Sequence, residues 1–528
     1  MRAPAIHLRW LALAAITALA ATLRLVDLGA VRLDPFYDAA VRSMSVSWHN
    51  FFFGAYEPGG SVAIDKPPID LWLQVAGVKL FGWSSLSLKL PEALAGIVSV
   101  PLLYAAIRRP FGTVAALVAA LALAVLPIEV ITARSDTMDG VMMLLLVLAL
   151  WLLVRACDGG GTLWLLGAAA ALGVAFNVKL LESLIALPGL FLLGALGLPS
   201  EAGRKLRQLA AASAVYLAVA LSWLGATLLY PAHERPWAIG SSNGSAWDAA
   251  FVFNGSERIS GKAAEVGAGR GAAKIAAPSP TRLLAHSGQL PGKWLGWEAL
   301  YALVLGAVAL VAAARRGAAR LRRASAVGIY VWLLTGVLLF SEMARLHPRY
   351  TESFAPAVAA AIGIGVGLVA ALRSPVRWLS VPLAAVLALP LLVSVQAVKE
   401  KVTDAGNVGG LAPGEQSALS AYLLPRTRGL RYELAAGSAT AVASLIVQDQ
   451  RPVLMLTTYN GRPFTSVPAL KGAIARREVR YAFINSFCGR PATAITAGCA
   501  ASSRWVRAHA SDVSRAAGLP PGVLWRLP

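Results

Sequence analysis

The sequence carries little charge for its length. Only 14% of its 528 residues are charged and 57% are hydrophobic, whereas a typical soluble domain is about 25% charged and roughly 45–50% apolar. Intrinsic disorder and coiled coil are excluded, because both need abundant charged or polar residues. A chain this apolar cannot be soluble along its whole length.

Cysteine and histidine are also scarce. Three cysteines, Cys157, Cys488 and Cys499, are too few for a disulfide scaffold or a four-ligand zinc site. The six histidines are scattered and form no HExxH motif, which argues against a dedicated metal cluster. A divalent metal ion held by carboxylate oxygens of Asp34, Asp38 and Asp65 stays a possible cofactor.

The charge that is present is mostly positive. Lys and Arg number 48 and Asp and Glu 27, giving a net charge of +21. Nucleic acid is one partner that such a charge can indicate. We expect no nucleic-acid partner, because membrane proteins collect Lys and Arg in their cytoplasmic loops and the composition is that of a membrane protein.

Long apolar runs predict about eleven membrane-spanning helices, since a bilayer is crossed by about 17–25 apolar residues. A cleaved signal peptide is the alternative for the first run, but that run continues past any suitable cleavage site. The runs lie at 10–28, 93–107, 112–130, 138–154, 162–178, 180–198, 209–229, 298–314, 324–340, 354–372 and 378–398.

Positive residues predict the orientation. With the N-terminus in the cytoplasm, the inner segments contain Arg2 and Arg9, Arg108 and Arg109, Arg155, 204–207, 315–323, and Arg373 and Arg377. The short outer loops contain far fewer, so the positive-inside rule places the N-terminus inside.

Two domains are expected. Residues 1–398 form the transmembrane domain, with outer loops 29–91 and 231–297. Residues 399–528 form a small extracytoplasmic domain, in which β-rich runs at 451–458 and 480–485 flank a helical pattern at 466–479. Strand, helix and strand in this order predict an α/β fold.

If this tail lies outside, Cys488 and Cys499 form a disulfide while Cys157 stays reduced; the alternative is three buried thiols.

The first outer loop holds the residues with the strongest chemical signal. Asp34 and Asp38 are four residues apart, so a helix places both carboxylates on one face; Asp34 could equally be only the N-cap of a helix that begins at Pro35. Asp65 and Lys66 precede two prolines. Residues 69–81 read as a short amphipathic helix in the membrane interface.

Other ionisable residues lie at the predicted outer ends of the spans. Such groups are costly near hydrocarbon and by default mark a functional cavity, although snorkelling to the surface is the alternative. Carboxylates there could remove a proton from a nucleophile, and Lys or Arg could hold a phosphate. The candidates are Arg134, Asp139, Asn177, Lys179, His347, Arg349 and Tyr350.

Several of these segments resemble a known family. An Asp after the first span, Asp65-Lys66-Pro67-Pro68 later in that loop, and the many spans resemble the GT-C class of polytopic glycosyltransferases, which includes protein O-mannosyltransferases and aminoarabinose transferases. Within it, the chain is most similar to YkcB-like bacterial mannosyltransferases. The residues that carry this similarity are 35–74, ARSDTMD (133–139), FNVKLL (176–181), 235–261 and 431–461.

The resemblance implies that a mannose or pentose-type sugar moves, with inversion, from a polyprenyl-phosphate donor to an acceptor at the outer face of the bacterial cell membrane. The acceptor is an unknown protein, glycan or lipid, and membrane lipid surrounds the enzyme. Asp34 is then the expected base, with Asp65 and Lys66 beside the reaction centre. Arg134, Lys179 and Arg349 are expected to hold phosphate, and Tyr37, Asp38, Asp139, Asn177, His347 and Tyr350 to contact substrate.

Two other functions fit the same composition. A transporter or flippase of lipid-linked sugars would also have many spans and a polar cavity, but it is typically built from broken helices and repeated halves, and no internal repeat is evident. A scaffold that binds cell-wall material through its outer domain is the third possibility.

Overall fold

The computed structural model describes residues 3–260, 277–284, 295–315, 317–344, 346–373, 375–406, 411–458, 462–484, 488 and 499–528. The chain divides into two compact units, which are described separately below. The helical unit comprises residues 1–32, 81–223 and 273–404. The mixed unit comprises residues 33–80, 224–272 and 405–528.

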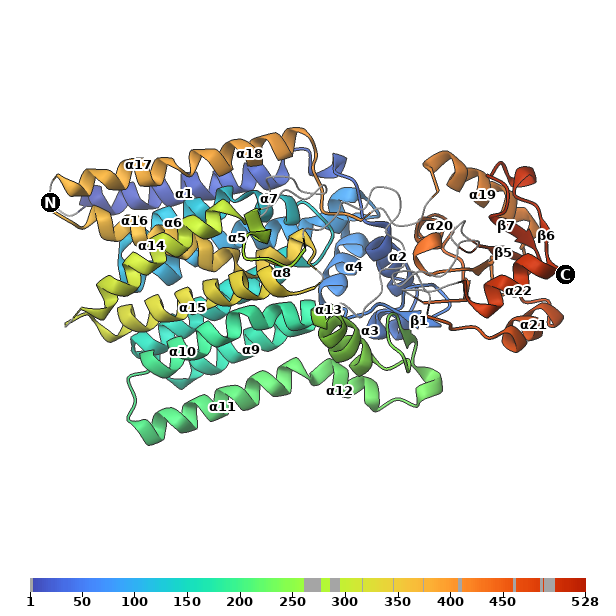
Figure 1. The fold of residues 1–528 in the computed structure, drawn as a ribbon, viewed down its shortest axis with the longest axis horizontal. Coiled ribbons are helices and arrows are strands. Elements are labelled where there is room, and N and C mark those ends of the chain that lie inside the picture. The colour runs from blue at the N-terminus through green and yellow to red at the C-terminus, as the bar shows by residue number, and fades with distance from the viewer. Residues whose placement is uncertain are drawn as a thin grey trace. The chain divides into compact units, whose positions relative to one another are not determined.

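The helical unit is a bundle of apolar helices (Figure 1). Only helices satisfy every backbone hydrogen bond within one segment in lipid, which suits the long apolar runs. Its helices are α1 (Ala3–Leu25), α5 (Ser85–Phe111), α6 (Thr113–Val125), α7 (Pro127–Thr132), α8 (Asp139–Arg155), α9 (Thr162–Lys179), α10 (Leu187–Gly197), α11 (Ala202–Ala220), α14 (Trp297–Ala314), α15 (Arg320–Glu342), α16 (Ala355–Ala370), α17 (Ser380–Ala385) and α18 (Ala388–Lys399). Helix α12 (Ser222–Leu228) continues α11 after a bend.

The prediction of a multi-pass helical membrane protein is confirmed. Within the described residues, eight helical segments are long and apolar enough to cross a membrane, or up to nine if α11 and α12, bent by 50°, form one span. The expected number was about eleven. Besides the bend between α11 and α12, two features lower the number of spans. Helix α6 has only 13 residues, and the runs 162–178 and 180–198 form one helical stretch of 36 residues, Thr162–Gly197.

Small residues bring the helices of this bundle close together. A methyl group added at Gly363 or Gly367 of α16 would collide with Ala115 of α6, and one added at Gly189 of α10 would collide with Trp332 of α15. Close approach over glycine and alanine is how helices gain van der Waals contact in lipid, where burial from water contributes nothing.

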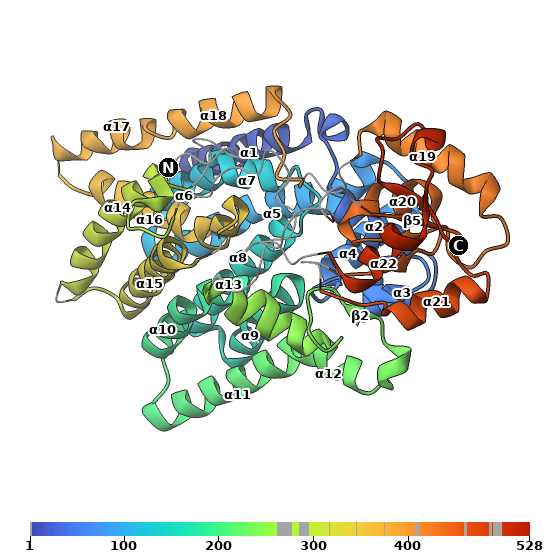
Figure 2. The same ribbon diagram turned by 45° about the vertical axis from the view of Figure 1, so that its right-hand side comes forward.

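The mixed unit contains a five-stranded sheet built from the C-terminal segment (Figure 2). The strands are β3 (Ala435–Ala436), β4 (Leu454–Met455), β5 (Tyr481–Phe483), β6 (Ser511–Asp512) and β7 (Leu524–Arg526), in the order β4-β3-β5-β7-β6. Strand β3 is parallel to β4 and β5, and β7 is antiparallel to β5 and β6. The helices of this segment are α19 (Pro413–Arg426), α20 (Ala443–Asp449), α21 (Val467–Ala475) and α22 (Ala501–His509).

The strand–helix–strand pattern of the tail is present as β4, α21 and β5, with Ser466 as the N-cap of α21. The sequence pattern missed β3, which lies between β4 and β5. A two-residue strand made of Ala435 and Ala436 has no hydrophobic alternation to reveal it. Its position follows from the pairing alone.

Residues 33–80 and 224–260 pack with this C-terminal segment inside the mixed unit. They contain α2 (Pro35–Met44), α3 (Trp48–Phe53), α4 (Ile69–Phe81), α13 (Glu257–Ser260) and the parallel strands β1 (Val62–Ala63) and β2 (Trp237–Ala238). Helix α4 has the bounds expected of the amphipathic helix. Its Trp72 stacks on Phe51 and donates to the Phe51 carbonyl, while Phe81 is exposed.

Three polar contacts connect the first loop to the C-terminal segment. The Tyr56 hydroxyl donates to the Ala439 carbonyl, Arg42 Nε donates to the Val447 carbonyl, and the Glu57 carboxylate accepts from the Val453 N–H. Helices α2 and α20 also pack against each other. The helix that begins after Asp34 is therefore supported by the C-terminal segment.

The predicted disulfide is present between Cys488 and Cys499. The ten residues that it encloses, 489–498, lie outside the described residues. Cys157 is free and buried in the helical unit. The two tail cysteines are thus paired, and Cys157 is shielded by packing.

Thiol labelling of intact cells tests the predicted orientation of the tail. A membrane-impermeant maleimide should label Cys488 and Cys499 only after reduction, because a disulfide persists on the oxidising outer side. Cys488→Ser frees Cys499, which should then be labelled without reductant. Buried Cys157 should react only after permeabilisation and unfolding. If Cys499 of the Cys488→Ser variant is protected until the cells are permeabilised, the tail lies inside.

Glu433 predicts a pH-dependent stability of the mixed unit. Its side chain is fully buried, and burial together with the neighbouring Asp449 raises its pKa to about 9. Because the pKa in the folded state is the higher one, its stabilising contribution is complete below pH about 4.5 and is lost as pH rises through about 9. Thermal unfolding of the purified protein should show Tm falling over this range. Glu433→Gln should flatten the fall, whereas the exposed control Glu234→Gln should not; equal profiles for all three proteins would contradict the assignment.

Candidate active site

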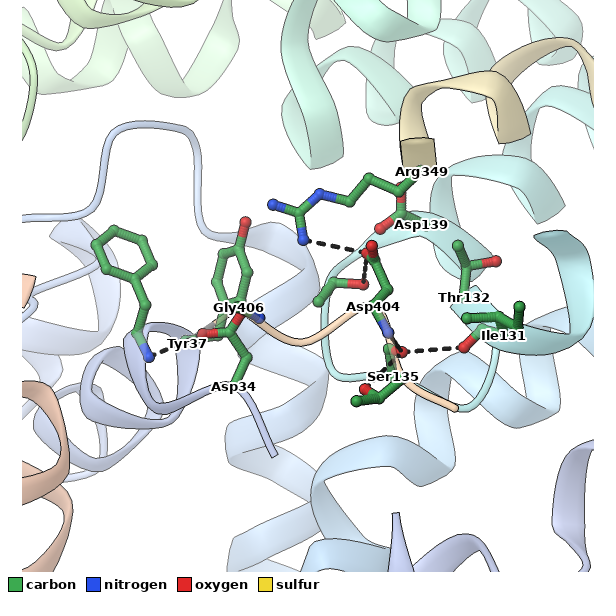
Figure 3. A network of polar contacts seen from close by, with 12 residues as sticks. Asp34, Tyr37, Ile131, Thr132, Ser135, Asp139, Arg349, Asp404 and Gly406 are labelled. Atoms are coloured by element: carbon green, nitrogen blue, oxygen red, sulfur yellow. Dashed lines mark hydrogen bonds and ion pairs between the residues drawn. The ribbon is translucent and has the colours of Figure 1, made fainter. Parts of the chain in front are cut away.

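Asp34 is the N-cap of α2, as the simpler sequence interpretation held. Its Oδ1 accepts from the Phe36 N–H at 3.0 Å, and Pro35 occupies the first helical position. Its Oδ2 accepts from the Gly406 N–H at 2.9 Å (Figure 3). The side chain is buried. Both carboxylate oxygens are therefore oriented by backbone donors, which fixes the group in one direction.

Asp65 and Lys66 form a second cluster in the same unit. Lys66 Nζ lies 3.5 Å from Asp65 Oδ1 and 3.4 Å from the Tyr37 hydroxyl, and 5.6 Å from the centre of the Tyr37 ring. Tyr37 belongs to the first turn of α2, three residues after Asp34. The structure thus brings Tyr37, Asp65 and Lys66 together; a reaction centre beside them stays a prediction.

Arg258 was missed by the sequence analysis. Its Nη2 lies 3.7 Å from Asp65 Oδ2, its Nε donates to Asn254, and Asn254 donates to the Asp65 carbonyl at 2.7 Å. Both residues fall inside the segment 235–261 that carries the family resemblance. A single sequence gives no reason to choose them there, because their contacts with Asp65 span 189 residues for Asn254 and 193 for Arg258.

The C-terminal segment also contacts α13, the short helix that contains Arg258. Arg462 pairs with both oxygens of Glu257 at 2.7 Å and donates to the Gly240 carbonyl. Glu257 precedes Arg258 in α13. A bidentate Arg–carboxylate pair fixes geometry as well as charge, so this pair positions the residue that contacts Asp65.

The metal hypothesis gains no support from this geometry. Within the described residues, no group of three or more His, Cys, Asp or Glu side chains is close enough to hold an ion. Asp34 is occupied by two backbone donors and Asp65 by two cations. Asp34, Asp38 and Asp65 do not converge on one point.

In the helical unit, Lys179 forms a buried ion pair with Asp139. Its ammonium also lies 3.0 Å from Glu182 and 5.6 Å from the centre of the Tyr350 ring. Asp139 is the first residue of α8, where the helix dipole favours a negative charge. Asp139, Lys179 and Tyr350, three candidates from different parts of the sequence, therefore lie together.

Arg349 pairs with Asp404, a residue that the sequence analysis did not single out. The distance is 3.1 Å (Figure 3), and Thr137 also donates to Asp404. Burial raises the pKa of Asp404 to about 6, although Arg349 opposes the shift. The available signal was an acid just beyond the last span, the same position that made Asp34 a candidate beyond the first.

Arg134 and Asn177 are engaged by the main chain. Arg134 Nη1 donates to the carbonyls of Leu23, Arg24 and Val26 at the C-terminal end of α1, where a positive charge is favoured by the helix dipole. Asn177 donates to the carbonyls of Gly173 and Val219. These contacts give both residues a structural role, and a phosphate or sugar contact for them stays an untested prediction.

Two further buried acids and one histidine complete the inventory. Glu129 and Glu352 are fully buried in the helical unit. Glu129 lies inside the predicted span 112–130, and Glu352 lies just before the predicted span 354–372. His347 packs edge-on against Tyr350, with ring centres 5.1 Å apart. Glu129 was missed entirely, because its charge lies within the predicted span 112–130.

Comparison with known proteins supports the resemblance. Residues 65–225 match the family described as "Dolichyl-phosphate-mannose-protein mannosyltransferase", and residues 419–509 match "Putative mannosyltransferase YkcB-like, C-terminal". The first match begins at Asp65 and includes Lys66, Asp139 and Lys179. The resemblance to YkcB-like mannosyltransferases is confirmed.

A curated relative and two solved structures define the extent of the likeness. The "Putative mannosyltransferase YkcB" of Bacillus subtilis is 38% identical over 240 residues, which are 46% of this chain and 33% of that protein. The chain therefore spans about a third of that relative's length. ArnT from Cupriavidus metallidurans bound to undecaprenyl phosphate has a TM-score of 0.53 at 19% identity and covers 88% of each chain. The oligosaccharyltransferase AglB from Archaeoglobus fulgidus has a TM-score of 0.58 at 13% identity, covering 90% of this chain and 69% of its own. These two show the shared fold.

Replacing Lys179 should reveal how much the buried pair stabilises the helical unit. Lys179→Met leaves Asp139 buried without its cation, which typically costs about 3–5 kcal/mol. The double variant Lys179→Met/Asp139→Asn should recover much of this loss, because the buried Asp139 charge is removed together with its cation. The matched control is Arg109→Gln, which breaks the half-exposed pair with Asp158 and should cost under about 1 kcal/mol. The free energy of unfolding in a denaturing-detergent titration measures all three; equal losses for Lys179→Met and Arg109→Gln would contradict the prediction.

Proposed function

We propose that this protein is a glycosyltransferase that moves a sugar from a polyprenyl-phosphate donor to a hydroxyl of a cell-envelope acceptor. The acceptor oxygen attacks the anomeric carbon, the bond from that carbon to the phosphate oxygen breaks, and the configuration inverts. The sugar is of mannose or pentose type, and the acceptor is a protein, glycan or lipid. The match of residues 65–225 to a mannosyltransferase family supports the reaction class.

The observation that carries the proposal is the geometry of Asp34. A base for an acceptor hydroxyl must be a carboxylate held in a fixed direction within reach of the reacting oxygen. Two backbone N–H groups hold Asp34 in this way at the start of α2. Tyr37, one turn further along α2, contacts Lys66. We therefore assign Asp34 as the base that takes the proton of the acceptor.

The leaving group is a polyprenyl phosphate, whose negative charge grows as the bond breaks. A fixed cation stabilises such a charge. Lys66 is the leading candidate, since its ammonium lies beside the Tyr37 hydroxyl with one carboxylate at 3.5 Å. Lys179 and Arg349 are further candidates for holding phosphate, each already paired with a carboxylate. Asp38, Asp139, His347 and Tyr350 are candidate substrate contacts.

The proposed location follows from the charge distribution. With the N-terminus in the cytoplasm, the tail and the outer loops lie on the outer face of the bacterial cell membrane. A donor with a polyprenyl chain enters from the bilayer, so reaction at the membrane surface suits its chemistry.

Transport of lipid-linked sugars is the second candidate. The observation that favours it is the 50° bend between α11 and α12, since broken helices are typical of transporter binding sites. Chemistry distinguishes the two functions: a transferase forms a new glycosidic bond in detergent, whereas a transporter needs a sealed membrane and forms none.

Incubation of the purified protein with polyprenyl-phosphate sugars tests the function directly. Radiolabelled mannosyl and pentosyl donors are supplied in detergent with envelope protein, glycan and lipid fractions. Transfer of label to one fraction, with release of polyprenyl phosphate, is the expected result. Movement of label across the membrane of sealed vesicles with no transfer in any fraction would replace the proposal with the transporter.

Substitution of Asp34 separates the base from the helix cap. Asn is as good an N-cap as Asp, so Asp34→Asn keeps α2 while removing the base and should cut turnover by about 10²–10⁴-fold. Donor affinity should change little. The matched control Ser47→Ala removes the N-cap of α3 in the same loop and should leave turnover within a few-fold of wild type. Near-normal turnover of Asp34→Asn excludes the base role.

A further inference from the structure

A cavity lies at the end of the helical unit where the N-terminus is found. It has a volume of about 470 Å³ and is formed by the first half of α1 and the last turns of α5 and α8. Figure 2 shows these helices within one bundle. Asp139 and Arg155 are the two ends of α8, about 24 Å apart at 1.5 Å per residue, so the cavity is remote from the Asp139–Lys179 pair.

Three arginines and three aromatic residues line this cavity. They are Arg108, Arg109, Arg155, Trp10, Tyr104 and Trp151. No lining residue that the structure describes carries a carboxylate; Asp158, which does not line it, pairs with Arg109. The cavity wall is therefore strongly cationic, and the guanidinium groups arrive from two different helices.

Two polar groups of the cavity residues lack a hydrogen-bond partner among the described residues. The Tyr104 side chain is 2% exposed, and its hydroxyl has no hydrogen-bond partner among the described residues. The Nε of Arg155 is likewise without a partner there, while its guanidinium lies 4.7 Å from the centre of the Trp164 ring. A buried hydroxyl without a partner is costly, so its presence in a cationic cavity points to an absent acceptor.

The residues that line the cavity indicate the chemistry of that acceptor. Arginine binds phosphate through several charge-assisted hydrogen bonds, and a tyrosine hydroxyl can donate one more. Trp and Tyr are the residues that anchor helices at the level of lipid headgroups. Basic pockets between membrane helices on the cytoplasmic side are suited to anionic headgroups.

We propose that this cavity binds the phosphate headgroup of an anionic membrane phospholipid at the cytoplasmic leaflet. Arg108 and Arg155 hold the phosphate, the Tyr104 hydroxyl donates to it, and Trp10 and Trp151 contact the start of the acyl chains. The site is independent of the proposed sugar transfer, because none of its residues belongs to the groups around Asp34 or Asp139.

Native mass spectrometry of the full-length protein in detergent tests the site. Phosphatidylglycerol, phosphatidylcholine, undecaprenyl phosphate and inorganic phosphate are each added in a graded series. We expect phosphatidylglycerol to bind at one saturable site at least about tenfold more tightly than phosphatidylcholine, as the gain of one charged hydrogen bond would give. Inorganic phosphate should not displace it at equal concentration.

Three variants identify the residues. Arg108→Gln/Arg155→Gln should weaken phosphatidylglycerol binding at least about tenfold. Tyr104→Phe removes only the hydroxyl and should weaken it by a smaller measurable factor, whereas a merely unsatisfied hydroxyl would leave binding unchanged. The matched control Arg204→Gln/Arg207→Gln removes two exposed arginines of α11 and should bind as wild type.

Several results would overturn the proposal. Equal binding of phosphatidylglycerol and phosphatidylcholine would mean non-selective lipid contact. Equal loss in the α11 control would mean that net charge alone attracts the lipid. Tighter binding of undecaprenyl phosphate, lost in Arg108→Gln/Arg155→Gln, would assign the cavity to a polyprenyl phosphate, and displacement by inorganic phosphate would assign it to the free ion.

Discussion

The cost of burying charge among apolar helices is the constraint on which this structure depends. An ion moved out of water loses several kcal/mol of hydration unless a partner compensates it in good geometry. The helical unit meets this cost by pairing: Lys179 with Asp139 and Glu182, and Arg349 with Asp404. Arg24 and Arg134 instead donate to main-chain carbonyls, at the contact of α1 with α6 and at the end of α1. The buried charges therefore fix which helix ends meet.

The mixed unit meets the same constraint by cross-linking segments that are distant in the sequence. Asp65 contacts Lys66 and Arg258, Glu257 contacts Arg462, and Glu57 accepts from Gly59, Ser61 and Val453. The Asp65–Arg258, Glu257–Arg462 and Glu57–Val453 contacts each join two of the three segments of this unit, residues 33–80, 224–272 and 405–528. The C-terminal segment is in this way part of the support of Asp34 and Asp65, which gives a structural reason for its presence in a chain of this kind.

The two sets of arginines in the helical unit illustrate how context decides the role of one residue type. Arg134 is buried and donates to the carbonyls that end α1. Arg108 and Arg155 lie at the other end of the bundle, against a cavity with aromatic walls. Sequence position beside an apolar run is the same for all three. The three residues differ in their surroundings: Arg134 has backbone carbonyls within hydrogen-bond distance, whereas Arg108 and Arg155 line a cavity.

The sequence by itself determined the membrane class, the positions of most apolar helices and the bounds of α4. It also offered the N-cap of α2 at Asp34 and the pairing of Cys488 with Cys499, each as one of two alternatives. These depend on local composition, on spacing, or on a short loop between two residues, and each can be read within a few turns of chain. The tertiary structure alone decided the partners of the charges. Arg258 with Asp65, Arg462 with Glu257 and Arg349 with Asp404 are separated by 55 to about 205 residues, and β3 is a strand only because β4 and β5 pair with it. Local propensity carries no information on such pairings, because they are selected by the cost of leaving each buried charge or backbone group without a partner.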